Sequence, residues 1–497
     1  MRNPKGPIMI DDMQSLYVTM PEIIVVVVAL VSLIAAAACG KRVTRHIGWL
    51  AIAAFAGAAA TLFCPQRLSQ LLNGALPVFA FKDQFVDDSF ARFTKLVILI
   101  SSSLSILLSW TYFEQDGDER PEYPVLIMFA TIGMMLMISA SNLLSLYVGL
   151  ELQSLSLYVL ATFKRDDMRS SEAGLKYFVL GSLASGILLY GISLIYGFAG
   201  TIDFVSLGYS LREQAHVNPG IVVGMVFICA GLAFKASGVP FHMWTPDVYE
   251  GAPTPVSAFF AAGPKLAALA LFARFLLEPM TGLSAQWHQV IIFISVASML
   301  WGAFGGLAQH NIKRLLAYSS IANVGYLLVG IIVGGKEGVQ AMLIYFTIYA
   351  LSVIGAFAIV LCMRRQGKQV EHIEELSGLS KTNPFITLAM TVIMFSLAGV
   401  PPLAGFFAKY FVFLAAVDAG MVPLALIGVV SSVVTAYYYL RIIKIMYFDE
   451  PVGHIDPLPD WGVKSVIGIS AFAMMGITIL PIPLIDATMK AAKSFIG

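Results

Sequence analysis

Five ionisable residues lie within or at the edges of long apolar segments, where a charge is costly. They are Glu151, Lys176, Lys235, Lys265 and Lys409. A charged side chain inside a bilayer is unfavourable unless it is paired or neutral, so such residues mark sites where ions or protons move. Burial favours the neutral amine of a lysine, whereas a nearby carboxylate favours its ammonium form. We therefore expect this set to load and release protons.

How far each residue lies inside its apolar segment helps to distinguish a proton-carrying side chain from one that only reaches the water at the membrane surface. Lys235 and Lys265 lie deep in their segments, where a lysine cannot easily extend to the membrane surface. Lys176 lies near the start of its segment, so an interfacial lysine is the alternative there. Glu151 lies early in LLSLYVGLELQSLSLYVLATF. It either faces water at the membrane end or is tuned by a lysine on a neighbouring helix.

Glycine and proline interrupt two apolar segments beside these lysines. The run FKASGVPF at 234–241 contains Lys235, and FSLAGVPP at 395–402 is followed by Lys409. The interrupting residues are Gly238, Pro240, Gly399, Pro401 and Pro402. A helix broken inside the membrane next to a buried charge is typical of proteins that transport ions.

The composition predicts an all-α polytopic membrane protein. Of 497 residues, 58% are hydrophobic and 12% are charged, whereas a soluble domain carries about 25% charged residues. The net charge of +1 gives no electrostatic reason to expect a nucleic acid partner. About fourteen stretches reach the roughly 20 apolar residues of a spanning helix. They are 20–39, 46–64, 90–113, 124–141, 142–163, 172–197, 219–239, 254–277, 287–308, 314–334, 337–363, 384–416, 420–447 and 463–482.

Lysine and arginine predict the orientation of these stretches. The basic connections are 41–46, 164–169, 311–314 and 364–368, and each follows an odd-numbered stretch. All four therefore lie on one side, which the positive-inside rule makes cytoplasmic. With an even number of stretches, both termini are predicted on the periplasmic side.

The two interrupted stretches also indicate an internal repeat. They lie five stretches apart, and an odd offset means that two five-helix units run in opposite senses, as in inverted-repeat transporters. A chance recurrence of Gly-Val-Pro is the alternative. We expect three N-terminal helices in 1–123, a first five-helix repeat (helices 4–8) in 124–280, a second, inverted one (helices 9–13) in 287–448, and helix 14 with a tail in 449–497.

The cysteines give no sign of a cofactor. Cys39, Cys64, Cys229 and Cys362 are isolated, and no CxxC or Cys/His spacing indicates a metal or an iron–sulfur cluster. No glycine motif for nucleotides is present either. We expect no cofactor in this chain, so its energy must come from a partner or an ion gradient.

Further polar residues are candidates for a supporting role. His242, Asp247, Glu250, His310, Lys313 and Arg314 lie in predicted loops, where they could serve proton uptake or be purely structural. Several deep polar residues could hold water, although serine in a bilayer helix often only bonds its own backbone. They are Ser182, Ser185, Ser237, Tyr318, Ser319, Ser320 and Asn323.

Three long runs resemble a known family. LELQSLSLYVLATF, FKASGVPFHMWTPDVYEGAPTPVSAFFAAGPK and IKRLLAYSSIANVGYLLVG are similar to the antiporter-like membrane subunits of respiratory complex I, over about residues 120–450. These subunits are related to those of multisubunit cation/proton antiporters and membrane hydrogenases. The resemblance implies fourteen helices, two inverted five-helix units and one proton channel in a bacterial inner membrane. Of the three such subunits, the largest has a long lateral helix that is not expected here, and the middle one has glutamate where this chain has Lys409.

The resemblance also implies roles and partners. Glu151 with Lys235 would be the coupling pair, Lys265 the central relay and Lys409 the exit-side residue, with Lys176 near the pair. Many relatives have histidine where this chain has Asn323, so hydrogen-bonded water must serve there. Flavin mononucleotide, iron–sulfur clusters and quinone would belong to partner subunits. The neighbours would be a second antiporter-like subunit and small membrane subunits, together with lipids.

We therefore interpret the chain as a subunit of a redox-driven proton pump. Two alternatives to this interpretation remain. One is a cation/proton antiporter or membrane hydrogenase subunit, and the other is a membrane scaffold that conducts nothing. Co-purification with flavin and iron–sulfur proteins would exclude the antiporter. Pumping that survives loss of the buried lysines would favour the scaffold.

Overall fold

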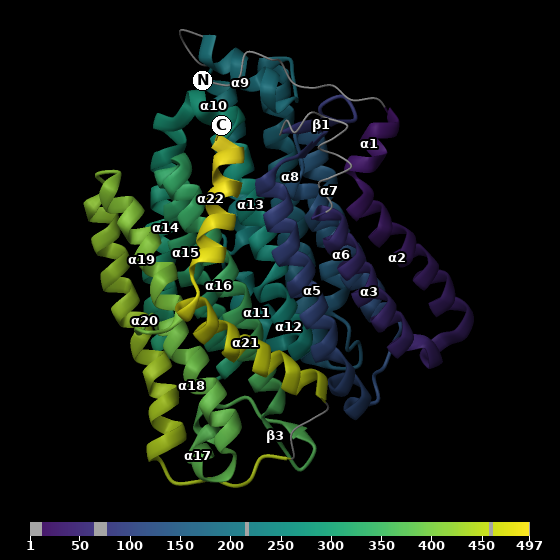
Figure 1. The fold of residues 1–497 in the computed structure, drawn as a ribbon, viewed down its shortest axis with the longest axis vertical. Helices are drawn as coiled ribbons and strands as arrows, with labels where there is room; N and C mark the ends of the chain where they lie inside the picture. The colour runs from purple at the N-terminus through teal and green to yellow at the C-terminus, as the bar shows by residue number, and fades with distance from the viewer. Residues whose placement is uncertain (1–11, 64–76, 214–217, 457–460, 497) are drawn as a thin grey trace.

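The computed structural model describes residues 12–63, 77–213, 218–456 and 461–496, and these residues are mostly helical (Figure 1). In these ranges, eleven segments are long and apolar enough to span a membrane, with Met20–Leu62 counted as one. Glu122–Ile138 and Pro384–Ala398 are shorter apolar helices. The predicted all-α polytopic class is therefore confirmed. The number of spans, the domain boundaries and the inverted repeats stay predictions.

The N-terminal half of the chain contains the following elements. The helices are α1 (Asp12–Val18), α2 (Met20–Cys39), η1 (Gly40–Val43), α3 (Thr44–Leu62), α5 (Ser89–Asp116), α6 (Glu122–Ile138), α7 (Leu143–Ala161), α8 (Met168–Ala199), α9 (Phe204–Glu213), α10 (Pro219–Ala236) and α11 (Trp244–Gly251). Two short strands, β1 (Val78–Ala80) and β2 (Phe85–Asp87), form an antiparallel hairpin in which Phe79 faces Val86.

The C-terminal half of the chain contains the remaining elements. The helices are α12 (Thr254–Ala261), α13 (Gly263–Leu277), η2 (Pro279–Leu283), α14 (Ser284–Leu307), α15 (Ile312–Val333), α16 (Gly335–Cys362), η3 (Ile373–Leu376), α17 (Leu379–Thr382), α18 (Pro384–Ala398), α19 (Ala404–Asp418), α20 (Val422–Phe448), α21 (Trp461–Ile479) and α22 (Ile482–Ile496). The strands β3 (Arg364–Arg365) and β4 (Lys368–Gln369) form a second antiparallel hairpin.

Short polar side chains begin several of these helices. Asp88 accepts a hydrogen bond from the Ala91 N–H at 2.7 Å at the start of α5. Asn142 and Asn311 do the same for the first turns of α7 and α15. These caps satisfy N–H groups that have no partner within the helix, which matters most where little water is available.

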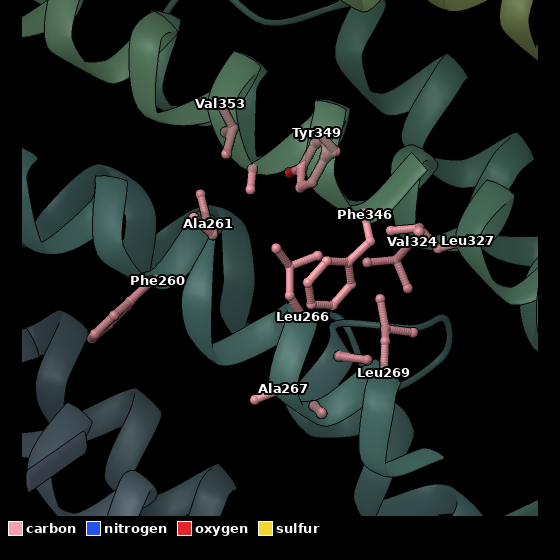
Figure 2. Packing of buried hydrophobic residues seen from close by; sticks show 14 of the residues in the cluster. Phe260, Ala261, Leu266, Ala267, Leu269, Val324, Leu327, Phe346, Tyr349 and Val353 are labelled. Atoms are coloured by element: carbon pink, nitrogen blue, oxygen red, sulfur yellow. The ribbon is translucent and has the colours of Figure 1, made fainter. Parts of the chain in front are cut away.

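The centre of the molecule is made of α12, α13, α15 and α16. The most apolar part of Thr254–Leu277 is entirely buried, and the most apolar parts of α15 and α16 are 89% buried. Figure 2 shows Leu266 and Leu269 of α13 beside Phe346 of α16. Helices that are apolar on every side pack in the interior, so the lysine carried by α13 is enclosed. Figure 1 places α2 and α3 at one flank of this centre and α19 and α20 at the other.

Both Gly-Val-Pro motifs coincide with helix ends. α10 ends at Ala236, and α11 begins at Trp244 after a cis Val239–Pro240 bond. α18 ends at Ala398, and α19 begins at Ala404 after a cis Pro401–Pro402 bond. A third interruption, which we did not predict, separates α12 from α13 at Ala262, where φ is −105° and ψ is −90°.

Basic connections meet at one end of the molecule. Residues from 164–169, 311–313 and 364–368 line a single cavity of about 790 Å³. The acidic connection after α5 contributes Asp116 and Asp118 to the same cavity. Three of the four basic connections therefore share one end. That 41–46 lies on the same side, and which side of the membrane this end faces, stay predictions.

The C-terminal tail is a helix, which the sequence analysis did not anticipate. α22 packs against α5 and α16, and the rings of Phe495 and Phe90 stack with centroids 4.4 Å apart. Its buried residues are Thr488, Ala491, Ala492 and Phe495, which lie on one helical face. The helix has fifteen residues and only one apolar face, so it is too short and too amphipathic to be recognised as a membrane span.

A buried arginine joins this helix to the rest of the molecule. Arg274 in α13 is fully buried, and its guanidinium pairs with Asp88 at 3.0 Å and Glu278 at 2.9 Å. Its Nε donates to the Ile138 carbonyl at 2.9 Å. The guanidinium also lies 5.3 Å from the ring of Phe495. Arg274 thereby ties α5, α6, α13 and α22 together.

Candidate functional site

Lys235 lies in the last turn of α10 and is 5% exposed. Its Nζ donates to Ser154 Oγ at 2.8 Å and to the Tyr158 hydroxyl at 3.2 Å, both on α7. The break after Ala236 is held by Trp244, whose Nε1 donates to the Phe234 carbonyl at 3.0 Å. The lysine is thus fixed at a broken helix end by neutral oxygens.

Glu151 shares one face of α7 with these two partners. Its position three and seven residues before Ser154 and Tyr158 gives that alignment. Within the described part of the chain, no ion pair links Glu151 to Lys235, and Glu151 Oε1 is buried without a hydrogen-bond partner. The predicted pair is therefore near but not in contact. A buried oxygen without a partner commonly bonds a water molecule.

Lys176 lies elsewhere, near the loop end of α8. Its side chain is 43% exposed and pairs with Glu172 at 2.8 Å and Asp247 at 3.0 Å. Asp247 also pairs with Arg314 at 2.8 Å, and Arg314 with Glu250 at 2.9 Å. The structure therefore places Lys176 in a half-exposed ionic network and not against Glu151 or Lys235.

Lys265 occupies the centre of the molecule. It follows the interruption at Ala262 and is 1% exposed. Its Nζ donates to Ser320 Oγ at 2.6 Å and lies 4.7 Å from the ring centroid of Tyr249. The apolar side chains in Figure 2 surround this break. An ammonium held here has polar support from one hydroxyl and from two aromatic rings, since the ring centroid of Trp244 lies 5.9 Å from Nζ.

Lys409 lies on α19, just after the second Gly-Val-Pro motif. It is 7% exposed, and its Nζ donates to the Ala398 carbonyl at 3.0 Å and to Ser432 Oγ at 2.8 Å. Gly399 has a φ of +85°, and a Cβ there would lie 2.9 Å from Lys409 Cδ. The broken helix thus supplies a free carbonyl, and glycine leaves room for the lysine.

Hydroxyl and amide groups extend from Lys265 along α15. Ser319, next to Ser320, lies 2.5 Å from the Tyr439 hydroxyl. Asn323 donates to the Ser319 carbonyl at 2.8 Å and accepts from the Tyr345 hydroxyl at 2.5 Å. The amide nitrogen and the amide oxygen of Asn323 thus both take part in this network, in which the position holds no titratable group.

The network continues towards Lys409. The Tyr326 hydroxyl lies 3.1 Å from Ser431 Oγ on α20, and Lys409 Nζ lies 5.5 Å from the Tyr326 ring centroid. Ser432 is the neighbour of Ser431 and bonds Lys409 directly. Ser319, Ser320 and Asn323 were identified from the sequence, whereas Tyr326 of α15, Tyr345 of α16 and the residues Ser431, Ser432 and Tyr439 of α20 were not. A tyrosine in an apolar run is too common to be distinguished without its partner.

Three buried charged residues, Lys95, Glu22 and Arg274, also went unnoticed in the sequence. Lys95 in α5 and Glu22 in α2 pair at 2.6 Å, with side chains 1% and 5% exposed. Arg274 is the third, with the partners given above. Lys95 lies near the start of a predicted span, as Lys176 does, so depth in the span could not show which of the two lysines is buried. Both buried pairs are complete, whereas Lys265 and Lys409 form no ion pair with any carboxylate in the described ranges.

The cysteines are expected to be dispensable as a set. Cys39 is exposed, Cys229 and Cys362 are buried and apart, and Cys64 lies outside the described residues. Replacing all four with alanine should leave assembly and activity near wild type, because buried cysteine behaves as a small apolar residue. Metal and cofactor content of the purified assembly checks this prediction, and loss of either in the variant would contradict it.

Comparison with known proteins identifies close relatives. Residues 140–435 match the family model described as NADH:quinone oxidoreductase/Mrp antiporter, TM. The chain is 54% identical over 84% of its length to NADH-quinone oxidoreductase subunit N of Rhodospirillum rubrum, of which 86% is covered. It is 50% identical to subunit N of Paramagnetospirillum magneticum, over 95% of this chain and 96% of that protein.

Solved structures share the fold. A chain of respiratory complex I from Thermus thermophilus, solved with bound aureothin, superposes with a TM-score of 0.77 at 31% identity, covering 94% of this chain and 99% of that one. A chain of the membrane-bound sulfane sulfur reductase, an archaeal respiratory membrane complex, gives a TM-score of 0.83 at 26% identity, with 98% of each chain covered.

Proposed function

The chain belongs to the NADH:quinone oxidoreductase/Mrp antiporter transmembrane family, within the group of NADH-quinone oxidoreductase subunit N, and on that premise we propose that its row of buried lysines translocates protons. The observation that carries the proposal is the environment of Lys265 and Lys409. Both ammonium groups are buried, and each is hydrogen-bonded to neutral oxygens only.

This environment allows a lysine to act as a proton carrier. Without a counter-ion, a buried ammonium is costly, and it becomes neutral when a proton acceptor is near. A positive charge arriving at one lysine then raises the cost of a charge on the next. The hydroxyl and amide groups between Lys265 and Lys409 give the proton a polar route, with water completing the steps that no direct hydrogen bond spans.

Glu151 and Lys235 form the switching end of this row in our proposal. When Glu151 is ionised and close, the ammonium of Lys235 is favoured, and when the two separate, Lys235 releases its proton. Ser154 and Tyr158 hold Lys235 in the separated arrangement. Lys409 is the exit-side residue, and Lys176 contributes to the ionic network at the loop end.

The source of energy lies outside this chain in our proposal. The redox chemistry, with flavin mononucleotide, iron–sulfur clusters and quinone, takes place in partner subunits, and this chain holds no redox site. Its direct neighbours are other membrane-arm subunits in the bacterial inner membrane, including a second antiporter-like one. We favour this function over a cation/proton antiporter because the relatives at 50–54% identity over most of the chain are subunits of NADH-quinone oxidoreductase.

Replacing Lys235 with alanine tests the proposal. We expect proton uptake and NADH:quinone turnover to fall together, because a tightly coupled pump stops when one of its steps stops. Both rates are measured in inverted membrane vesicles, with assembly checked on a native gel. Lys464→Ala, which removes a lysine from the exposed face of α21, is the matched control. Normal rates of both processes in an assembled Lys235→Ala complex would exclude the role.

A further inference from the structure

Trp244, the first residue of α11, contacts both the helix end that carries Lys235 and the site of Lys265. The side chain is buried, and its Nε1 donates to the carbonyl of Phe234, the residue directly before Lys235, at 3.0 Å. The centroid of the same indole lies 5.9 Å from Lys265 Nζ. One side chain therefore joins the surroundings of two lysines that come from different helices.

The hydrogen bond to Phe234 holds the broken end of α10 from outside that helix. The carbonyls of the last turn of a helix have no partner further along it. Ser237, which follows α10, has a φ of +67°, a conformation that residues other than glycine rarely adopt. Its N–H also donates to the Phe234 carbonyl, at 3.1 Å. The indole and the turn thus share one acceptor, so a movement of the helix end also moves the acceptor of the indole N–H.

A stack of aromatic rings forms a second connection between the indole and Lys235. Tyr177 of α8 stacks on Trp244 with ring centroids 4.5 Å apart and an interplanar angle of 22°. The other neighbour of Tyr177 is Tyr158, whose ring lies edge-on at 5.0 Å. The Tyr158 hydroxyl accepts one of the two hydrogen bonds that Lys235 donates. A change at Lys235 therefore reaches the indole through its own helix and through α7 and α8.

The support that the indole gives to Lys265 depends on its position. A cation is attracted to the face of an aromatic ring within about 6 Å of the ring centroid. Trp244 lies close to that limit, whereas Tyr249, at 4.7 Å, lies well inside it. A small displacement of the indole therefore changes its contribution, while that of Tyr249 persists. Because protein interiors are closely packed, such displacements pass from one side chain to the next.

We propose that Trp244 is a positioning residue that couples the arrangement of Lys235 to the charge that Lys265 can hold. When Lys235 approaches or leaves Glu151, the end of α10 moves, the indole moves with the Phe234 carbonyl, and the ammonium of Lys265 gains or loses support. The two lysines then load and release protons in a fixed order. This inference rests on the proposed function, because it concerns how two steps of proton transfer are kept in sequence.

Trp244→Phe tests the coupling, because phenylalanine keeps an aromatic ring and removes the N–H that bonds Phe234. A neutral hydrogen bond shifts an equilibrium by about two- to tenfold, so the order of loading is weakened and not abolished. In inverted vesicles containing the whole complex, we expect fewer protons to be taken up per NADH. NADH oxidation continues within the same two- to tenfold range, and a proton ionophore stimulates it less than in wild type.

Trp287→Phe is the matched control. Trp287 is equally buried, and its Nε1 donates to the Met280 carbonyl at 2.9 Å. It belongs to α14, which contains no lysine. Loss of this hydrogen bond should affect assembly to a similar extent and leave the number of protons per NADH at the wild-type value. The comparison therefore separates coupling from a general loss of stability.

Two results would overturn the proposal. One is an assembled Trp244→Phe complex with the same number of protons per NADH as Trp287→Phe. The other is a fall of both rates in proportion, which indicates a structural role. If Trp244→Phe fails to assemble, Tyr177→Leu removes the ring that stacks on the indole, and a wild-type number of protons per NADH in that variant would overturn the proposal too. An unchanged number alongside a stalled Lys235→Ala complex would exclude coupling through Trp244 and leave the proposed function standing.

Discussion

Replacing Lys265 with methionine is expected to stop proton uptake and NADH:quinone turnover almost completely in an assembled complex. Methionine has a similar length and fills the buried site without a charge, so the packing of α13 against α15 and α16 is kept. The change removes the amine that donates to Ser320 at 2.6 Å and that can carry a proton. Loss of a positioned proton-transfer group lowers a rate by about two orders of magnitude or more.

The control for this prediction is a lysine at the loop end. Lys381→Met changes a residue whose side chain is 59% exposed and whose nearest acidic partner, Glu450, is 3.8 Å away. Exposed pairs of this kind contribute about 0–1 kcal/mol, so its rates should match wild type. If Lys265→Met assembled and pumped as well as Lys381→Met, the central lysine would have no part in translocation.

Substitutions of Glu151 should follow the charge of the side chain and not its shape. Glu151→Asp keeps the carboxylate and moves it back by one methylene, a small electrostatic loss. Glu151→Gln keeps size and hydrogen bonding but removes the charge that favours the ammonium of Lys235. The expected order of proton uptake is wild type, then Glu151→Asp, with Glu151→Gln and Glu151→Ala both close to zero.

The structure sharpens this prediction. Because Glu151 does not touch Lys235, its influence must act through space or through a rearrangement, and both require a charge. A glutamate with a structural role gives the reverse order, since glutamine packs and bonds in the same way. Vesicle proton uptake at matched assembly distinguishes the two cases, and glutamine outperforming aspartate would remove Glu151 from the coupling pair.

Hydropathy and helix-breaking residues accounted for much of the architecture. Each predicted stretch is helical over most of its length, because the bilayer demands both length and satisfied backbone groups. Gly238 and Gly399 lie where helices end, since glycine and proline are poor in helix interiors. Gly263 and Pro264 directly follow the interruption at Ala262, so the same signal was present there but was not interpreted as a break. The helix α22 is too short to be found by length.

The candidate site was predictable in position but not in contacts. Burial of Lys235, Lys265 and Lys409 follows from their depth in apolar runs. Their partners, Ser154, Ser320 and Ser432, come from other helices, and a single sequence gives no register between helices. The surroundings of Lys176 were not predictable for the same reason. Its partner Asp247, which was predicted in a loop, lies in the short helix α11, 71 residues along the chain. The depth of Lys176 alone therefore indicated more burial than it has.

Proton uptake and NADH oxidation, followed together in inverted vesicles containing Lys265→Met, test the central claim most directly. The claim is that buried lysines of this chain carry protons driven by redox chemistry in partner subunits. It predicts that both rates fall to the background of vesicles lacking the complex, and that a proton ionophore does not restore NADH oxidation, because the missing step lies inside the protein. An assembled variant that oxidises NADH at the wild-type rate with the wild-type number of protons per NADH would contradict the claim.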